Sequence, residues 1–442
     1  MMEELADLGA DIVSLTLGIG AIFLLYVAIS GACFAAWNFA SGFRQKAGDF
    51  TSRKTVTFGD ESAVTANRTA SIVAVLSIFL IWGAFTGSVI SPLHVPGPFI
   101  GETSFTYTAQ NPAGETDDAK VHIIVHPIGE EPPDPALPAS AEEGFAKDDI
   151  LKVGAWRSKL LRAHRNDEGG GEDGFRVIAV NGQPIAPEQS VDLDDGAVLM
   201  TARGSLSFTP NKGLQMEAIW LPAPEAVVAR LIEIANEGYQ NVSLGENLFW
   251  SLARVVIGFA LGCLFGIPLG FAMGLSSWFR GWFDPIVEFM RPVPPLALIP
   301  LVIIWFGIWE QGKISLLFLA ALWIMTISAR AGVSGVNISK VHAAYSLGAS
   351  KWQILRRVIW PNSLPEIFTG ARVAMGVCWG TVVAAELVAA EKGAGKMIIA
   401  ASKFQQTDIV IMGIILIGII GYGIDILMRM LERWLIPWKG KA

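Results

Sequence analysis

The chain has 442 residues, of which 52% are hydrophobic and only 17% are charged, and its formal net charge is -7. Because a soluble globular protein usually carries nearer a quarter charged residues, this composition argues against a soluble domain and favours a membrane protein. The acidic balance gives no indication of nucleic-acid binding, and the three cysteines lie in apolar segments that offer neither a disulfide framework nor a metal site.

The N-terminal segment is predicted to be a permanent membrane anchor. Its first eleven residues carry Glu3, Glu4, Asp7 and Asp11 but no Lys or Arg. A secretory signal peptide begins with a positively charged region, so a cleavable signal is not expected. The apolar run at 12–39 that follows is long enough to cross a membrane as a helix.

Seven apolar segments are predicted to span the membrane. They lie near residues 12–39, 69–91, 247–279, 285–309, 314–334, 368–390 and 408–434. Backbone groups in lipid must be satisfied within the segment, so these segments are expected to be helices. The fourth is interrupted by Pro292, Pro294, Pro295 and Pro300, and we expect a broken helix that faces protein or a water-filled cavity.

Short basic segments predict the orientation, because Lys and Arg are enriched on the cytoplasmic side of membrane proteins. Basic residues outnumber acidic ones at 40–68, at 335–367 and at the C-terminus. All three are therefore expected to be cytoplasmic. With seven spans, the N-terminus and residues 92–224 then lie outside the membrane on the periplasmic side.

The external region differs in character from the spans. Alternating stretches at 104–109, 121–125, 175–181 and 197–209 predict strands, whereas 141–174 is charged. We expect a small β-sandwich with a partly helical insertion. The segment 224–237 that follows has a helical apolar period and is expected to lie along the outer membrane surface.

Glycines at every fourth position mark one face of the third span. They are Gly258, Gly262, Gly266, Gly270 and Gly274. Small residues let membrane helices approach closely, so this face is predicted to be a packing surface. It could pack within one subunit or form the contact between two copies of the chain.

Glu386 is the ionisable residue most clearly placed inside a predicted span, and such groups are costly in a membrane and often functional. It is a candidate for the translocation pathway, where a carboxylate could meet an ammonium group of a zwitterionic substrate. Arg330, Arg372, Arg291 and Pro294 are the other candidates for this pathway. The alternative is that Glu386 pairs with a neighbouring helix, for example through Arg330 or Arg372.

The segment 335–367 carries the most specific pattern of the chain. It reads His342-Ala-Ala-Tyr-Ser-Leu-Gly348, followed by Trp352, the pair Arg356-Arg357, and Val358-Ile-Trp-Pro361. A short helix that ends near Gly348 and a second helix that presents Trp352 and the basic pair would fit a groove in a partner protein.

This pattern resembles the loop with which importer permeases dock onto their ATPase subunit. Ala343, Ala344, Gly348 and Pro361 stand at the family spacing, whereas His342, Val358 and Trp360 replace the family's Glu, Ile and Leu. The resemblance implies that His342, Ala343, Ala344, Gly348, Trp352, Arg356, Arg357 and Pro361 couple this chain to an ATPase.

The resemblance extends over about 221–438 and is closest to the taurine-type sulfonate permeases of ATP-binding-cassette (ABC) importers. It is carried by Leu221-Pro-Ala-Pro-Glu-Ala-Val, Asp284-Pro-Ile-Val-Glu288, Arg291-Pro-Val-Pro-Pro-Leu-Ala297, Trp305-Phe-Gly307, Ala384-Ala-Glu386-Leu and Leu-Ile-Pro437-Trp. Nitrate, aliphatic-sulfonate and pyrimidine-precursor permeases share much of this pattern. The extra N-terminal span and the large external insertion depart from the family, whose members have six core spans.

The resemblance implies an all-α polytopic membrane protein of the type I ABC importer permease fold, with an inserted β-rich domain similar to cadherin-like or immunoglobulin-like sandwiches. We expect residues 1–68 to form the extra anchor and a cytoplasmic linker, 69–91 the first core helix, 92–220 the insertion and 221–442 the core permease with its coupling loop at 335–367.

The same resemblance implies a transporter subunit without enzymatic activity of its own, which translocates taurine or a related small sulfonate. Its expected partners are an ABC ATPase dimer, a periplasmic substrate-binding protein, a second copy of itself and the membrane. No cofactor is expected in this chain, because ATP and Mg would be bound by the ATPase. In agreement, Gly393-Ala-Gly-Lys396 lacks the first Gly and the Ser or Thr of a phosphate-binding loop.

Three alternatives remain open at this stage. The substrate could be another small anion or zwitterion, such as nitrate or an aliphatic sulfonate. The chain could be an ion-coupled secondary transporter, but Glu386 alone is poor support for the internal relay of acids or histidines that such a protein needs. It could also be a membrane-tethered binding module built around 92–220.

Overall fold

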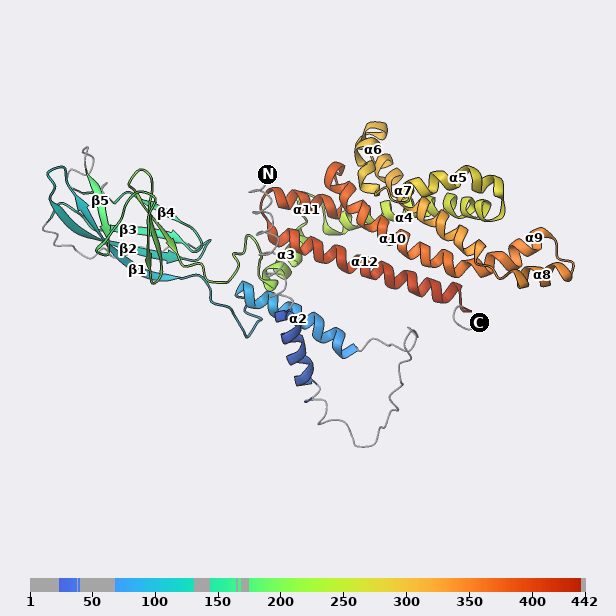
Figure 1. The fold of residues 1–442 in the computed structure, drawn as a ribbon, viewed down its shortest axis with the longest axis horizontal. Coiled ribbons are helices and arrows are strands. Elements are labelled where there is room, and N and C mark those ends of the chain that lie inside the picture. Colours follow the sequence, from blue (N-terminus) through green and yellow to red (C-terminus); the bar gives the residue numbers. More distant parts are fainter. Residues whose placement is uncertain are drawn as a thin grey trace, which may run out of the picture. The chain divides into compact units, whose positions relative to one another are not determined.

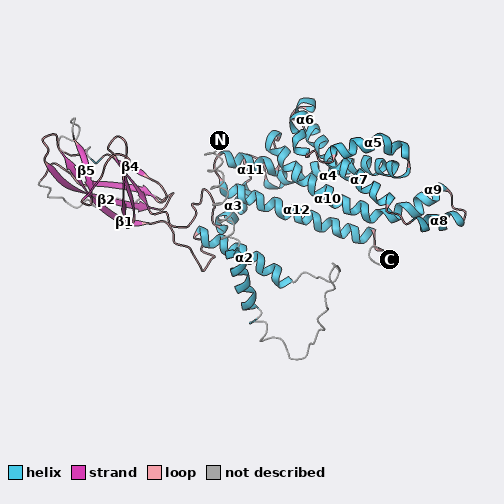
Figure 2. Ribbon diagram, in the orientation of Figure 1, coloured by secondary structure: helices cyan, strands magenta, loops and turns pink. Residues whose placement is uncertain are grey.

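The computed structural model describes residues 24–37, 39, 68–130, 144–163, 166–167 and 175–438. They form two compact units, Met1–Glu225 and Ala226–Ala442 (Figure 1). The strands gather in the first unit, and the second is built of helices (Figure 2). The linker predicted between the first two spans and the first residues of the predicted anchor lie outside the described residues.

The first unit contains two apolar helices, Leu24–Trp37 and α2 (Arg68–Thr86). α2 is long and apolar enough to cross a membrane, whereas the described part of the first helix is shorter. Ser77 and Thr86, the polar residues in α2 after its first turn, donate their hydroxyl protons to the carbonyls of Val73 and Trp82. These bonds satisfy polar groups that lipid cannot.

Nine strands among the described residues form two sheets in the same unit. The five-stranded sheet has the order β3-β2-β1-β5-β6, and the four-stranded sheet has the order β4-β9-β8-β7. Their bounds are β1 Gly101–Gln110, β2 Thr116–His126, β3 Asp149–Gly154, β4 Lys159–Leu161, β5 Arg176–Val180, β6 Gln183–Pro184, β7 Ser190–Leu193, β8 Gly196–Met200 and β9 Leu206–Pro210. β1 and β2 pair antiparallel from Gly101↔Val125 to Gln110↔Thr116, whereas β2 and β3 pair in parallel.

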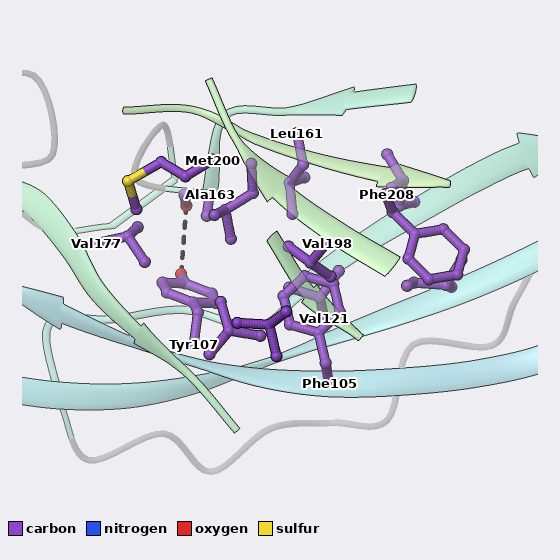
Figure 3. Close-up of a cluster of buried hydrophobic side chains, with 14 of the residues drawn as sticks. Phe105, Tyr107, Val121, Leu161, Ala163, Val177, Val198, Met200 and Phe208 are labelled. Atoms are coloured by element: carbon purple, nitrogen blue, oxygen red, sulfur yellow. Dashed lines mark hydrogen bonds between the residues drawn. The ribbon is translucent and has the colours of Figure 1, made fainter. Parts of the chain in front are cut away.

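The two sheets share one hydrophobic core. Phe105, Tyr107 and Ala109 are buried at alternate positions of β1, because successive side chains of a strand point to opposite faces. They pack with residues of the other sheet that include Val198 and Phe208 (Figure 3). The hydroxyl of Tyr107 lies within hydrogen-bonding distance of the Ala163 carbonyl, at 3.3 Å, so this large side chain is buried with its polar atom satisfied (Figure 3).

The predicted helical insertion at 141–174 is wrong for the part that is described. Residues 149–154 and 159–161 form β3 and β4 instead, and β3 adds to the edge of the sheet beside β2. Leu151 and Val153 of β3 are buried at alternate positions, which is the strand period. The charges that surround this short run obscured its alternation in the sequence.

Two connecting segments, 87–100 and 211–223, join the sheets to α2 and to the next helix. They are hydrogen-bonded to each other through Leu214 N to Pro96 O (2.8 Å) and Phe99 N to Asn211 O (2.9 Å). Gly213 has a φ of +62°, and a Cβ at this position would overlap the backbone of Gly97. The connection is therefore a paired segment that needs glycine where its two backbones meet.

The second unit is an assembly of helices. They are α3 Pro224–Glu237, α4 Leu244–Leu275, α5 Ser277–Met290, η3 Pro295–Leu298, α6 Ile299–Phe306, α7 Glu310–Ser334, α8 Ile338–Ser346, α9 Lys351–Ile354, η4 Leu355–Ile359, α10 Trp360–Ala389, α11 Ala394–Lys403 and α12 Thr407–Leu435. α4, α7 and α10 pack around a core of small and medium side chains such as Ala321, Met325 and Ala374.

The described residues contain five helices long and apolar enough to cross a membrane, and six if one bent pair counts as a span. The bent pair is α5 with η3 and α6, which meet at 94° across 291–294. The break therefore occurs where the prolines of the fourth predicted segment remove backbone donors. The first predicted span, at 12–39, is described only in part, as the shorter helix Leu24–Trp37.

The second helix of the 335–367 loop continues without a break into the sixth predicted span. Helix runs continuously from Lys351 to Val388 through α9, η4 and α10. Its wider π-helical turn, η4, ends two residues before Pro361. Because proline donates no backbone N–H, a locally widened turn accommodates it without ending the helix.

Candidate functional site

The glycine face of α4 packs against α7 of the same subunit. A Cβ at Gly258 would overlap the Cβ of Leu317, and one at Gly262 would overlap that of Ala321. Further along, a Cβ at Gly266 would lie 2.8 Å from the Leu322 carbonyl oxygen. Gly270 and Gly274 are equally close to Ala329 and Val333. Of the two interpretations left open by the sequence, this is packing within one subunit.

A buried ionic cluster lies at the start of α4 and α7 and the end of α10. Arg254, whose side chain is 3% exposed, donates from Nε and Nη2 to the carboxylate of Glu310 at 2.6 and 2.8 Å. Its Nη1 donates to Glu386 at 2.6 Å. Lys313, also buried, donates to Glu310 at 2.9 Å. Two cations and two carboxylates from three helices therefore neutralise one another.

The turn between α10 and α11 and the first residues of α11 close over this cluster. The backbone amides of Gly393, Ala394 and Gly395 donate to Asn247 Oδ1, Ser251 Oγ and Glu386 Oε2, at 2.8, 3.0 and 3.0 Å. A Cβ at Gly393, where φ is +143°, would overlap the Glu386 carboxyl group. The Gly393-Ala-Gly-Lys396 segment, which superficially resembles part of a phosphate-binding loop, thus uses its amides to bind side chains of α4 and α10.

The other pathway candidates lie away from this cluster. Arg330 pairs with Asp284 and Glu288 of α5, and Arg372 pairs with Asp425 of α12. Glu386 does pair with a neighbouring helix, as the alternative predicted, but the suggested partners Arg330 and Arg372 are wrong, because its partner is Arg254 of α4.

Two further candidates belong to the bend between α5 and α6. The side chain of Arg291 is 66% exposed and lies 3.8 Å from Glu288. Pro294 precedes η3 in an extended conformation. Neither residue contributes to the ionic cluster around Glu386.

The 335–367 loop forms two short helices joined at a glycine. α8 begins after Asn337, which caps it by accepting from the Ser339 amide, and the chain turns at Gly348 with a φ of +78°. Ser350 and Gln353 then form a reciprocal capping box that starts α9. Gly348 allows the sharp turn after α8, and the two caps accept hydrogen bonds from backbone amides at the start of α8 and α9. Together they fix the angle between the helices.

This loop exposes large apolar and basic side chains. Leu347 and Trp352 are 88% and 67% exposed, and Arg356 and Arg357 are exposed as well. His342 and Ala343 are exposed on α8, whereas Ala344 is partly covered. Pro361 lies in the first turn of α10 and is partly covered. Large apolar groups exposed beside cations are typical of a surface that binds another protein.

An apolar groove of about 1090 Å³ lies between the second half of α4 and the start of the α9–α10 helix. Leu264, Ile267 and Phe271 line it from α4, and Trp352 and Trp360 line it from the other side. The rings of Phe271 and Trp360 are 5.1 Å apart at their centroids. The groove therefore connects the exposed loop directly to the helix that carries the glycine face.

Comparison with known proteins identifies the family. Residues 264–437 match the family of binding-protein-dependent transport system inner membrane components. The chain is 44% identical over 261 residues to the taurine transport system permease protein TauC of Escherichia coli, an alignment that covers 59% of this chain and 93% of that protein. The chain belongs to the ABC importer permeases of the taurine and sulfonate type.

Two other relatives extend the range of substrates in the family. The permease is 38% identical over 219 residues to the putative aliphatic sulfonates transport permease protein SsuC of Escherichia coli, covering 50% of this chain and 82% of that protein. It is 33% identical over 198 residues to the bicarbonate transport system permease protein CmpB of Synechococcus elongatus, covering 44% and 71%. The permease is thus a helical, membrane-spanning transporter subunit and not an enzyme.

Sequence reasoning missed most of the ionic cluster of the permease. Glu386 was singled out, but Arg254, Glu310 and Lys313 were not. Arg254 directly precedes the uncharged stretch of the third span, and Glu310 and Lys313 directly precede that of the fifth. Charges at the same end of neighbouring predicted spans are a signal for pairing, although the partners can be assigned only once the helices are packed.

Proposed function

We propose that this permease translocates taurine or a closely related small sulfonate, delivered by an external binding protein and driven by two ATPase subunits. The observation that supports taurine as the substrate is the 44% identity to TauC across 93% of that protein. This identity exceeds the 38% identity to SsuC and the 33% identity to CmpB. Aliphatic sulfonates and small inorganic anions are the alternatives within the same family.

The 335–367 loop is the proposed contact with the ATPase. Its two short helices present Leu347, Trp352 and the Arg356–Arg357 pair outward on a turn fixed at Gly348. An exposed tryptophan beside two arginines suits a groove in a partner, since Trp and Arg dominate binding energy in protein interfaces. Continuity of α9 with α10 gives this contact a rigid lever, because a helix transmits a displacement along its axis.

We extend the proposal to a homodimer with the loop in the cytoplasm and the β-rich insertion in the periplasm. The basic character of 335–367 supports this orientation. The pathway would lie between two copies, with Arg291, Pro294, Arg330 and Arg372 as candidates to line it. Glu386 is the weakest candidate, because the cluster around it leaves no part of its side chain exposed in the subunit.

The insertion is proposed to be a docking aid for the binding protein. It follows α2 directly and returns to α3 through the paired connection at 87–100 and 211–223, which would hold it near the membrane. Replacing 99–218 with a short Gly/Ser linker should raise the binding-protein concentration for half-maximal uptake while changing the maximal rate little. A weakened dimer at unchanged apparent affinity would instead make the insertion a dimer clamp.

The experiment that tests the function is reconstitution. The tagged permease is co-purified with its ATPase and binding protein, placed in vesicles and supplied with labelled taurine. We expect ATP-dependent uptake that unlabelled taurine suppresses more strongly than an aliphatic sulfonate, nitrate or bicarbonate does. Stronger suppression by one of the other compounds would indicate that this compound, and not taurine, is the preferred substrate. Uptake driven by an ion gradient without ATP would contradict the transporter class.

A further inference from the structure

Arg254 connects four segments of the second unit at the end opposite the 335–367 loop. It lies on α4, binds α7 through Glu310 and binds α10 through Glu386. Its Nη1 also donates to the carbonyl oxygen of Lys392 at 2.8 Å, which belongs to the turn before α11. No other guanidinium among the described residues joins as many segments with so little exposed surface.

The carboxylate of Glu386 has no capacity to serve a second role while this arrangement persists. It accepts from Ser251 Oγ at 2.8 Å, from Arg254 and from the Gly395 amide, and its side chain is 0% exposed. Separating α4 from α10 would leave charged groups buried without partners. Such a change is strongly unfavourable, so a transporter is expected to avoid it in every state of its cycle.

The glycine face continues this connection along the helices. Gly258 to Gly274 hold α4 against the backbone of α7 over sixteen residues, which is about 24 Å of helix at roughly 1.5 Å per residue. A slide of one helix past the other would bring α7 side chains onto positions with no space for them. α4 and α7 are therefore held along their length as well as at the ionic end.

The ion pairs that join the other elements are more exposed than the Arg254–Glu386 pair, in which both side chains are buried. Arg372 and Asp425, between α10 and α12, are 34% and 33% exposed. Glu288, which pairs with Arg330 between α5 and α7, is 47% exposed. Of the pairs formed by Arg254, only the one with Glu386 is enclosed on both sides, because Glu310 is 43% exposed. Breaking an enclosed pair leaves a buried charge without a partner, whereas a pair that is open on one side can exchange partners at lower cost.

From this contrast we infer that Arg254 is a positioning residue that holds α4, α7, α10 and residues 391–395, at the start of α11, as one block throughout the transport cycle. Movement takes place at the boundaries of this block, against α5–α6 and α12. The inference rests on the proposed function, because it assigns the block a place in a transport cycle. The ionic cluster is thus a permanent joint and not a gate that opens.

Glu246 and Lys392 provide a test that leaves the buried cluster untouched. They form an ion pair at the rim, between α4 and the turn, and each is 40% exposed. Both are replaced by cysteine in a permease whose Cys33, Cys263 and Cys378 are replaced by alanine. A short bifunctional methanethiosulfonate reagent then joins them in the complete reconstituted complex, and loss of maleimide labelling measures the extent of cross-linking.

The cross-linked permease is expected to import taurine within two-fold of the rate of the same sample after reduction. The matched controls are the two single-cysteine variants treated with the same reagent. A larger loss that the reductant restores would mean that the joint opens during transport, and it would overturn the inference. If the reduced sample and the unmodified permease both fail to import taurine, the proposed function fails instead.

Hydrogen–deuterium exchange at 393–395 gives a readout that does not depend on the substrate. We expect slow exchange of these amides both without nucleotide and in the vanadate-trapped complex. Arg254→Gln should accelerate it at least ten-fold, and Arg254→Lys, which keeps the charge, should accelerate it less. Fast exchange in either state of the unmodified complex, or no effect of Arg254→Gln, would contradict a permanent joint positioned by Arg254.

Discussion

Gly262 of α4 lies directly against Ala321 of α7, and a Cβ added at 262 would overlap the Ala321 Cβ. This is the centre of a face on which five glycines allow two helices to meet backbone to backbone. Close approach of this kind is what stabilises helix pairs in lipid, where the hydrophobic effect between helices is absent.

Gly262→Ala is therefore expected to destabilise the permease by about 1–3 kcal/mol, the range typical of overpacking. The measurement is unfolding of the purified permease in detergent. Gly418→Ala in α12 is the matched control, because no atom stands within 4 Å of a Cβ at that position. It should be neutral or slightly stabilising. Equal effects of the two substitutions would argue against close packing at Gly262.

The buried cluster predicts strong coupling between Arg254 and Glu386. Either Arg254→Gln or Glu386→Gln leaves the cluster with one uncompensated charge, and each should cost about 3–5 kcal/mol. The double variant keeps Glu310 and Lys313 as a neutral pair, so its loss should be clearly smaller than the sum of the two single losses. The same detergent unfolding experiment measures all three. Additive losses would show that the two residues do not interact.

Substitutions of Gly348 separate the effect of charge from the effect of shape at the proposed ATPase contact. Its φ of +78° is one that Asn and Asp tolerate better than other side chains, and no atom stands within 4 Å of a Cβ there. Gly348→Asp should abolish substrate-stimulated ATP hydrolysis and import, because it buries an unpaired charge in the partner's groove. Gly348→Asn, equal in shape, should keep most of both. Full activity of the Asp variant in vesicles would contradict the assignment of this loop as the ATPase contact.

The hydrogen bonds of Glu225 predict that the mobility of the connection between α2 and the sheets depends on pH. Burial acts to raise the pKa of Glu225, but hydrogen bonds from the Ser88 hydroxyl (2.6 Å), from its own backbone amide and from the Val89 amide (3.0 Å) together outweigh it, so the pKa lies below its usual value of 4.5. A carboxyl group with a depressed pKa stabilises the folded connection fully at pH values above 4.5. This stabilisation is lost as the pH falls through the lower pKa of the folded state.

A spin label at Leu93, which is 72% exposed, should therefore become more mobile as the pH falls below 4.5. Glu225→Gln should remove this pH dependence, since an amide does not titrate in that range. Glu237→Gln, on the exposed end of the same helix, is the control and should leave the dependence intact. A pH profile that survives Glu225→Gln would assign the effect to another group.

The orientation predicts which side of the membrane two exposed lysines face. Lys212 lies in the connection below the sheets, and Lys351 begins α9. A cysteine at 212 should react with a membrane-impermeant thiol reagent added to intact cells from the periplasmic side. A cysteine at 351 should react only after permeabilisation. The opposite pattern would mean that the number of spans differs by one from the prediction.

Much of the site could be predicted from the sequence because its signals are local. The four-residue period of the glycines, the prolines of the broken span and the spacing from Ala343 to Pro361 are each contained within one segment. The structure places the break at 291–294 and the turn at Gly348, where these residues imply them. Strands β1 and β2 were likewise visible as alternation, whereas β3 and β4 were too short and too charged to be recognised.

The sequence by itself determined that the chain is a membrane protein built of helical spans, with one glycine face, a carboxylate at Glu386 inside a span, and a loop that resembles the ATPase-docking loop of importer permeases. Only the tertiary structure decided what these features contact. The glycine face meets α7, and Glu386 meets Arg254, which lies 132 residues earlier in the chain. The physical reason is that composition and period depend on neighbours along the chain. The partner of a buried charge depends on which distant helices pack together and in which register, and no local pattern specifies that.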